Sequence, residues 1–234
     1  MSKGGVSGAK KEKLYKDLPR PKLNRAQISK IYEHLERLDP NPKTELNYSN
    51  PYTLVVAVAL SAQSTDVGVN KATKALFEKA DTPEKMVALG EEVVRDHIKT
   101  IGLYKNKAKN VVALSQMLID DYDSVVPQTR EDLIRLPGVG RKTANVVMNE
   151  AFGHPTMAVD THIFRVSNRT GMAPGKDPYE VELNLLRVTP ERFALGAHHW
   201  LILHGRYTCV ARKPKCYNCA ISDICQFRPK TDAP

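Results

Sequence analysis

A turn that combines two glycines with two basic residues is the first feature of this sequence that could bind a ligand or catalyse a reaction. It spans residues 136–143 and reads Leu-Pro-Gly-Val-Gly-Arg-Lys-Thr. An acidic segment precedes it and an apolar segment follows, which predicts two short helices joined by the turn. Glycine tolerates positive φ, so the N–H groups around Gly138 and Gly140 can point outward together and bind phosphate. An ordinary tight turn is the alternative, and the glycine spacing excludes a mononucleotide-binding loop.

Lys142 and Asp160 supply the groups that could react. Lys142 lies in the first turn of the second expected helix, beside Arg141 and near the positive end of that helix. Both neighbours disfavour the charged amine, and an uncharged amine can act as a nucleophile. A solvated lysine near DNA is the alternative. Asp160 follows eighteen residues later, where another helix is expected to begin. An aspartate at that position typically caps the helix, and a carboxylate that accepts backbone N–H bonds stays ionised, so a cap can also be catalytic.

All four cysteines lie close together near the C-terminus, with the spacing Cys209-x6-Cys216-x2-Cys219-x5-Cys225. Structural zinc sites usually pair two short Cys-x-x-Cys motifs, whereas here one such motif lies between two longer arms. A [4Fe–4S] cluster fits this spacing better, and zinc is the alternative. The first arm carries three basic residues that could contact phosphates, namely Arg212, Lys213 and Lys215.

The remaining pattern is helical, and no segment shows sustained two-residue alternation, so the expected fold class is all-α. Four pairs place a capping residue before proline at an expected helix start: Asn50-Pro51, Thr82-Pro83, Asp177-Pro178 and Thr189-Pro190. Helices are expected from about residue 25 and over residues 51–62, 66–80, 83–90, 91–99, 104–121, 129–136, 141–152, 161–169, 178–187 and 190–204.

Basic residues outnumber acidic ones by 35 to 26 in the 234 residues, which gives a net charge of +9. This charge favours a polyanionic partner. Residues 1–24 carry +5 of it, with several glycines and prolines and few large apolar side chains. They are predicted to form a disordered basic tail that either has no role or adds nonspecific DNA affinity. A mitochondrial presequence is a further alternative.

Apolar runs in this sequence are too short to span a membrane, and the N-terminus lacks the hydrophobic core of a signal peptide. We therefore expect no membrane partner and a cytoplasmic protein, with a monomer as the default. Its 41% hydrophobic content suffices for one sizeable core or two smaller ones.

Three motifs together closely resemble bacterial endonuclease III, a family of DNA glycosylases in the helix-hairpin-helix superfamily. They are Leu-Pro-Gly-Val-Gly-Arg-Lys-Thr-Ala, Val-Asp-Thr-His and the four cysteines, and the resemblance covers about residues 25–227. It implies a two-lobed fold. A six-helix barrel would occupy residues 44–154, with the helix-hairpin-helix at about 129–152, and residues 25–43 and 155–230 would form the [4Fe–4S] cluster domain.

The resemblance also implies roles for single residues. Lys142 and Asp160 would be catalytic, and Gly138, Gly140 and Arg141 would bind the DNA backbone. Gln63 and Leu103 would enter the gap left by an extruded base, although spacing alone makes Gln63 the end of a helix and Leu103 a core residue. Asp66 and His162 would lie near the base pocket.

The function implied is a bifunctional DNA glycosylase and abasic-site lyase in bacterial base excision repair. Its substrate would be double-stranded DNA with oxidised pyrimidines or abasic sites, so the protein would associate with the nucleoid. Two alternatives remain. In a monofunctional glycosylase, Asp160 would activate water without a lyase step, and a noncatalytic DNA-binding or redox module would need neither Lys142 nor Asp160.

Overall fold

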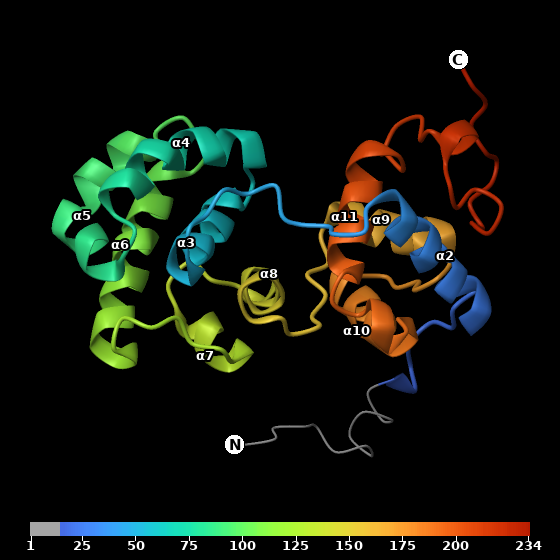
Figure 1. The fold of residues 1–234 in the computed structure, drawn as a ribbon, viewed down its shortest axis with the longest axis horizontal. Coiled ribbons are helices and arrows are strands. Elements are labelled where there is room, and N and C mark those ends of the chain that lie inside the picture. The colour runs from blue at the N-terminus through green and yellow to red at the C-terminus, as the bar shows by residue number, and fades with distance from the viewer. Residues whose placement is uncertain (1–14) are drawn as a thin grey trace. The chain divides into compact units, whose positions relative to one another are not determined.

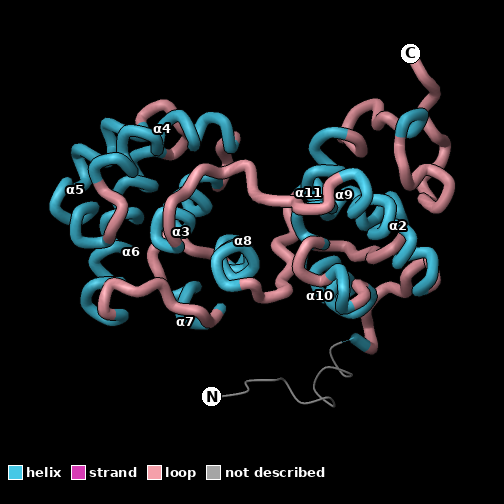
Figure 2. The backbone as a smooth tube through the Cα atoms, in the orientation of Figure 1, coloured by secondary structure: helices cyan, strands magenta, loops and turns pink. Residues whose placement is uncertain are grey.

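The computed structural model describes residues 15–234 and contains helices, turns and loops but no strand in that part of the chain (Figure 2). The all-α prediction is confirmed. The chain divides into two compact units. We call Lys43–Ala158 the barrel unit, and the residues up to Pro42 together with Val159–Pro234 the cluster unit. The second crossing between units lies after residue 158, whereas the sequence placed it after 154.

The barrel unit contains six helices, all within its described residues (Figure 1). They are α3 (Pro51–Ser61), α4 (Asp66–Lys79), α5 (Pro83–Ile98), α6 (Tyr104–Tyr122), α7 (Arg130–Arg135) and α8 (Arg141–Phe152). The two helices expected over 83–90 and 91–99 are present within α5, where Gly90, with φ 74° and ψ 164°, is not helical and separates them.

Helix α3 is the centre of the barrel unit because it is apolar on every side. All residues from Tyr52 to Leu60 are buried, and α3 contacts α4, α6 and α8. A helix that is hydrophobic all round is stable only when other helices enclose it. The largest fully buried side chains of this unit form one core around it: Leu54, Leu60, Leu76, Met86, Ile98, Leu114, Leu118 and Leu133.

The cluster unit contains the α-helices α2 (Arg25–Leu38), α9 (Thr161–Thr170), α10 (Pro178–Val188) and α11 (Ala197–Tyr207), with short 3-10 turns at Glu191–Phe193 and Cys216–Asn218. An aromatic trio fills its core. The Tyr32 and Phe193 rings stack with centroids 5.5 Å apart, and the Trp200 ring lies 6.1 Å from Phe193. The Trp200 indole N–H donates to the Asp39 carbonyl at 2.8 Å, which satisfies its polar atom.

Three of the four expected cap-and-proline starts are confirmed, because the side chains of Asn50, Thr82 and Asp177 accept backbone N–H bonds at helix N-termini. The fourth, at Thr189, is wrong. Thr189 ends α10, and its hydroxyl lies 2.9 Å from the Tyr32 hydroxyl. The helix expected over 190–204 therefore begins only at residue 197.

The expected tail over residues 1–24 needs a correction for its second part. Residues 1–14 lie outside the described residues. Farther along, the Lys22 N–H donates to the Gly171 carbonyl at 2.8 Å, the Asn184 amide donates to the Pro19 carbonyl at 3.1 Å, and Leu23 is buried. These long-range contacts attach residues 15–24 to the cluster unit.

Candidate nucleic-acid interface and cysteine pocket

The glycine turn joins α7 to α8 as expected. Leu136 and Val139 are buried and fix the turn to the barrel core, whereas Gly138 and Gly140 are exposed. Gly138 has φ +78°, and a Cβ there would lie 3.0 Å from the Asn110 Cβ, so only glycine fits without strain. Because Gly140 is the N-cap of α8, no side chain caps this helix. An uncapped helix N-terminus beside such a turn can bind a phosphate.

Lys142 is exposed at the second position of α8, directly after this turn. The residues that follow in α8 are mostly buried and include Asn145, which the sequence analysis missed. The Asn145 side chain accepts from Arg130 Nε at 2.8 Å and donates to the Met157 carbonyl at 2.9 Å. It therefore binds α7 and the segment before residue 158 to the helix that carries Lys142. The one signal in the sequence was a polar residue among the apolar residues of that helix.

Asp160 is the N-cap of α9, as its position predicted. Its Oδ1 atom accepts from the backbone N–H groups of His162 and Ile163, both at 2.9 Å. His162 lies in the first turn of α9, where its Nδ1 accepts from Arg165 at 3.2 Å. Asp66 is the first residue of α4, in the other unit.

Gln63 and Leu103 occupy two turns of the barrel unit that approach each other. Both have positive φ, 55° and 59° respectively, which is rare for residues other than glycine. A Cβ on Gly102 would lie 3.7 Å from the Gln63 carbonyl oxygen. The interpretation of Leu103 as a core residue is wrong, because its side chain is 58% exposed at the N-cap of α6.

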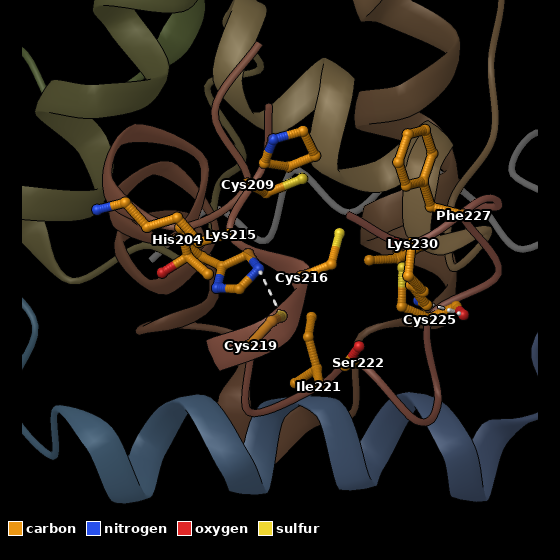
Figure 3. A pocket seen from close by; sticks show the side chains of 13 residues that line it. His204, Cys209, Lys215, Cys216, Cys219, Ile221, Ser222, Cys225, Phe227 and Lys230 are labelled. Atoms are coloured by element: carbon orange, nitrogen blue, oxygen red, sulfur yellow. Dashed lines mark hydrogen bonds between the residues drawn. The ribbon is translucent and has the colours of Figure 1, made fainter. Parts of the chain in front are cut away.

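The four cysteines line one pocket of the cluster unit, together with His204, Ile221, Phe227 and Lys230 (Figure 3). All four are free thiols. Within residues 15–234, no three His, Cys, Asp or Glu side chains converge on a position for a single ion. The four cysteines therefore share one pocket without the geometry of a ligated single ion.

Charges around the pocket act on the thiols in opposite directions. Burial and, to a smaller extent, the other three cysteines raise the pKa of Cys219 to about 11. Burial also opposes ionisation of Cys216, but the Thr231 hydrogen bond and the Lys230 and Arg169 charges lower the pKa of that thiol overall. Several thiolates in one buried pocket repel one another, and a cationic metal core would relieve this repulsion.

Two arginines that the sequence analysis did not single out hold the cysteine loop, residues 208–231, against α9. Arg165 donates to the carbonyls of Gly205 at 2.7 Å and Cys209 at 2.8 Å. Arg169, one turn later, donates to the carbonyls of Val210 at 2.8 Å and Ala211 at 2.9 Å. Their four-residue spacing places them on one face of α9. The basic residues Arg212, Lys213 and Lys215 are exposed on the loop that these bonds fix.

No helix in the described residues combines the length and hydropathy needed to cross a membrane.

Comparison with known proteins agrees with these features. Residues 56–191 match the family described as HhH-GPD superfamily base excision DNA repair protein. The chain is 55% identical to endonuclease III of Escherichia coli K12 over 210 residues, which cover 90% of this chain and all of the relative. It is 52% identical to endonuclease III of Treponema pallidum over 203 residues, 87% of this chain and 96% of that protein.

Solved structures give the same result. A trapped endonuclease III–DNA covalent intermediate aligns with a TM-score of 0.82 and 45% identity, covering 87% of this chain and 96% of that one. A thermostable thymine-DNA glycosylase aligns with a TM-score of 0.75 and 26% identity, covering 94% and 97%. The chain therefore belongs to the HhH-GPD superfamily of base excision DNA repair proteins and, within it, to the endonuclease III family.

Proposed function

We propose that this protein removes oxidised pyrimidines from double-stranded DNA through a Schiff base on Lys142 and then cleaves the strand 3′ to the abasic site. Glycosylase and lyase activity in base excision repair is the activity of its family. The main supporting observation is that Lys142 is exposed at the second position of α8, directly after the glycine turn proposed to bind phosphate. A relative is known as a covalent intermediate with DNA, and such an intermediate requires a nucleophile.

The turn between α7 and α8 would bind the DNA backbone. Gly138 and Gly140 leave its N–H groups accessible, the N-terminus of α8 adds a positive dipole end, and Arg141 adds a full charge. Arg212, Lys213 and Lys215 would contact further phosphates from the cysteine loop.

Base extrusion would precede chemistry, since C1′ of a stacked nucleotide cannot be reached. Leu103 is an exposed apolar side chain on a left-handed turn, and Gln63 lies on the adjacent turn. Inserted together, they would fill the gap in the duplex and offset the cost of unstacking. Oxidised, ring-saturated pyrimidines stack poorly, so extrusion costs less for them. Asp66 and His162 are proposed to lie near the base.

As a carboxylate, Asp160 would stabilise positive charge on the sugar while the base departs, and it would then accept the proton that the Lys142 amine loses as Nζ bonds to C1′. The base leaves with the electron pair of the glycosidic bond. Lys142 Nζ bonds to C1′, and opening of the sugar ring gives the Schiff base. Loss of a proton at C2′ then forms a C2′–C3′ double bond and expels the 3′ phosphate. Water hydrolyses the imine and frees the lysine.

The four cysteines are the proposed ligands of a [4Fe–4S] cluster, because they are free thiols that line one pocket. When bound, the cluster would cross-link the arms of the loop and keep its basic residues in place. We also propose a monomer in the cytoplasm, where a reducing environment preserves thiolate ligands.

Borohydride trapping on duplex DNA with one oxidised pyrimidine tests the proposal. We expect a covalent adduct and strand cleavage with the native chain and neither with Lys142→Gln, although that variant still binds abasic DNA. Asp160→Asn should slow base release by about 10²–10⁴-fold. Lys85→Gln removes another exposed lysine from the first turn of a barrel helix and is the matched control.

The outcomes separate the alternatives. Base release without an adduct would favour the monofunctional reaction with water activated by Asp160. An adduct that persists in Lys142→Gln would contradict the assignment of the nucleophile. If the native chain binds DNA but neither releases the base nor cleaves the strand, the noncatalytic DNA-binding module remains.

A further inference from the structure

Lys107 is a buried lysine in the first part of α6. Lys107 is only 7% exposed, and its Nζ donates to the Ser64 hydroxyl at 2.8 Å. It forms no ion pair with the other residues that the structure describes, and burial lowers the pKa of its amine. Burying an amine beside a neutral hydroxyl is unfavourable, and a methionine would fill the same volume without that cost. The role of this residue therefore lies in what its amine binds.

The Ser64–Lys107 bond joins the two turns that carry Gln63 and Leu103. Ser64 directly follows Gln63 in the chain. At its other end, the Lys107 backbone N–H donates to the Leu103 carbonyl at 3.0 Å. Lys107 thus binds one turn through its backbone and the other through its side chain.

Both turns need such support because their conformations are unfavourable in isolation. Gln63 and Leu103 have positive φ, and strained residues of this kind persist only where the surroundings fix them. Leu103 caps α6 without a side-chain hydrogen bond. The close approach of the Gln63 carbonyl to Gly102 shows that the turns run side by side, so a bond between them also sets their separation.

We propose that Lys107 is a positioning residue that, through Ser64, holds the turns of Gln63 and Leu103 in register so that both side chains enter the duplex together. This inference rests on the proposed insertion of those two residues. Without the bond, either turn can relax to a commoner backbone conformation, and the two side chains no longer arrive as a pair. A hydrogen bond from a charged donor typically contributes enough for about a tenfold change in an equilibrium.

The test uses Ser64→Ala, Lys107→Met and the double variant. Extrusion is followed by the fluorescence of 2-aminopurine placed beside a ring-saturated pyrimidine in duplex DNA. The lyase reaction is measured separately as strand cleavage at an abasic site in single-stranded DNA, because this substrate requires no insertion of side chains into a duplex. Thermal unfolding checks that each variant is folded.

We expect each single variant to lower the extrusion equilibrium by about tenfold, and the double variant to be no worse than the singles because both remove one bond. Cleavage of single-stranded abasic DNA should stay within about twofold. Ser64→Thr keeps the hydroxyl and should therefore show the same extrusion equilibrium as the native chain. Ser61→Ala is the matched control, because Ser61 is a neighbouring half-buried serine whose hydroxyl bonds the Val58 carbonyl instead.

Gln63→Ala and Leu103→Ala distinguish the failure of this inference from that of the proposed insertion. If these variants reduce extrusion while Ser64→Ala and Lys107→Met do not, the positioning role is overturned and the insertion stands. If Gln63→Ala and Leu103→Ala leave extrusion unchanged, both are overturned. An equal loss in Ser61→Ala, or additive losses in the double variant, would also overturn the positioning role.

Discussion

The two units fix their proposed catalytic residues by different means. In the barrel unit, α8 carries Lys142 and packs its buried face against the apolar helix α3. In the cluster unit, α9 begins at Asp160 and is bound through Arg165 and Arg169 to backbone carbonyls of α11 and the cysteine loop. Both helices bury apolar side chains, since Ile163 and Val166 of α9 are fully buried, but α9 is in addition bound by two arginines to a loop without regular structure.

The difference between α8 and α9 suggests a structural role for a cluster, which would support catalysis by positioning Asp160 without entering the reaction. The arginine bonds join α9 to the loop only while the loop keeps its shape, and the one regular element of the loop is the short turn Cys216–Asn218. Ligation of the four cysteines would fix that shape and, through the arginines, the position of Asp160. The barrel unit should be largely independent of this support.

The largest effect is expected from Cys225→Ser, which removes one proposed ligand. We expect loss of the visible iron–sulfur absorbance and, by hydrogen exchange, a fall of several kcal/mol in the protection of residues 205–227. Amides of α3 should keep most of their protection. Ser222→Ala alters another residue that lines the pocket and should retain the absorbance. Equal loss of protection in α3 would contradict the difference between the units.

The converse variant acts on the barrel unit. Val55 is fully buried in α3, and Val55→Ala should lower the free energy of unfolding by about 1.5–3 kcal/mol. Urea denaturation measures this change, and the iron–sulfur absorbance should persist in the native protein. Val67→Ala is the matched control, since Val67 is 80% exposed in α4 and should change stability by about 0.5 kcal/mol or less. Loss of the cluster in Val55→Ala would show that the units are not independent.

Local signals in the sequence predicted most of the fold. Helix starts such as Asn50-Pro51 combine a side-chain cap with a fixed proline φ, and both act within four residues. Thr189-Pro190 has the same local signal, but Thr189 ends α10 and its hydroxyl lies beside that of Tyr32, 157 residues away. A contact of this kind is invisible until the chain is folded.

The candidate site divides in the same way. Lys142, Asp160 and the four cysteines could be selected because residue type and spacing alone indicate their chemistry. The residues that hold them, Asn145, Arg165 and Arg169, could not, since their role consists of bonds to backbone carbonyls that no spacing reveals. Leu103 was assigned to the core locally because hydrophobicity does not show that a leucine lies on an exposed left-handed turn.

The smallest predicted effect compares one motif in both units. Asn24 and Asn50 each form a capping box, at the starts of α2 and α3. The Asn24 box is exposed, whereas Asn50 is half-buried and its amide also donates to the Asp81 carbonyl at 2.9 Å. Replacement by alanine removes the cap in both cases, but only at residue 50 does it leave a partly buried carbonyl without that donor.

We therefore expect about 0.5–1 kcal/mol of destabilisation from Asn24→Ala and about 1–2 kcal/mol from Asn50→Ala. Urea denaturation of the full chain measures each loss. Hydrogen exchange of α3 amides and the iron–sulfur absorbance, recorded during denaturation, would assign each loss to the barrel unit or the cluster unit. Asn50→Ser is the sharpest control, because it keeps a neutral N-cap acceptor and removes the amide donor. If Asn50→Ser were as stable as the native chain, the bond to Asp81 would contribute nothing, and the two caps should then cost the same.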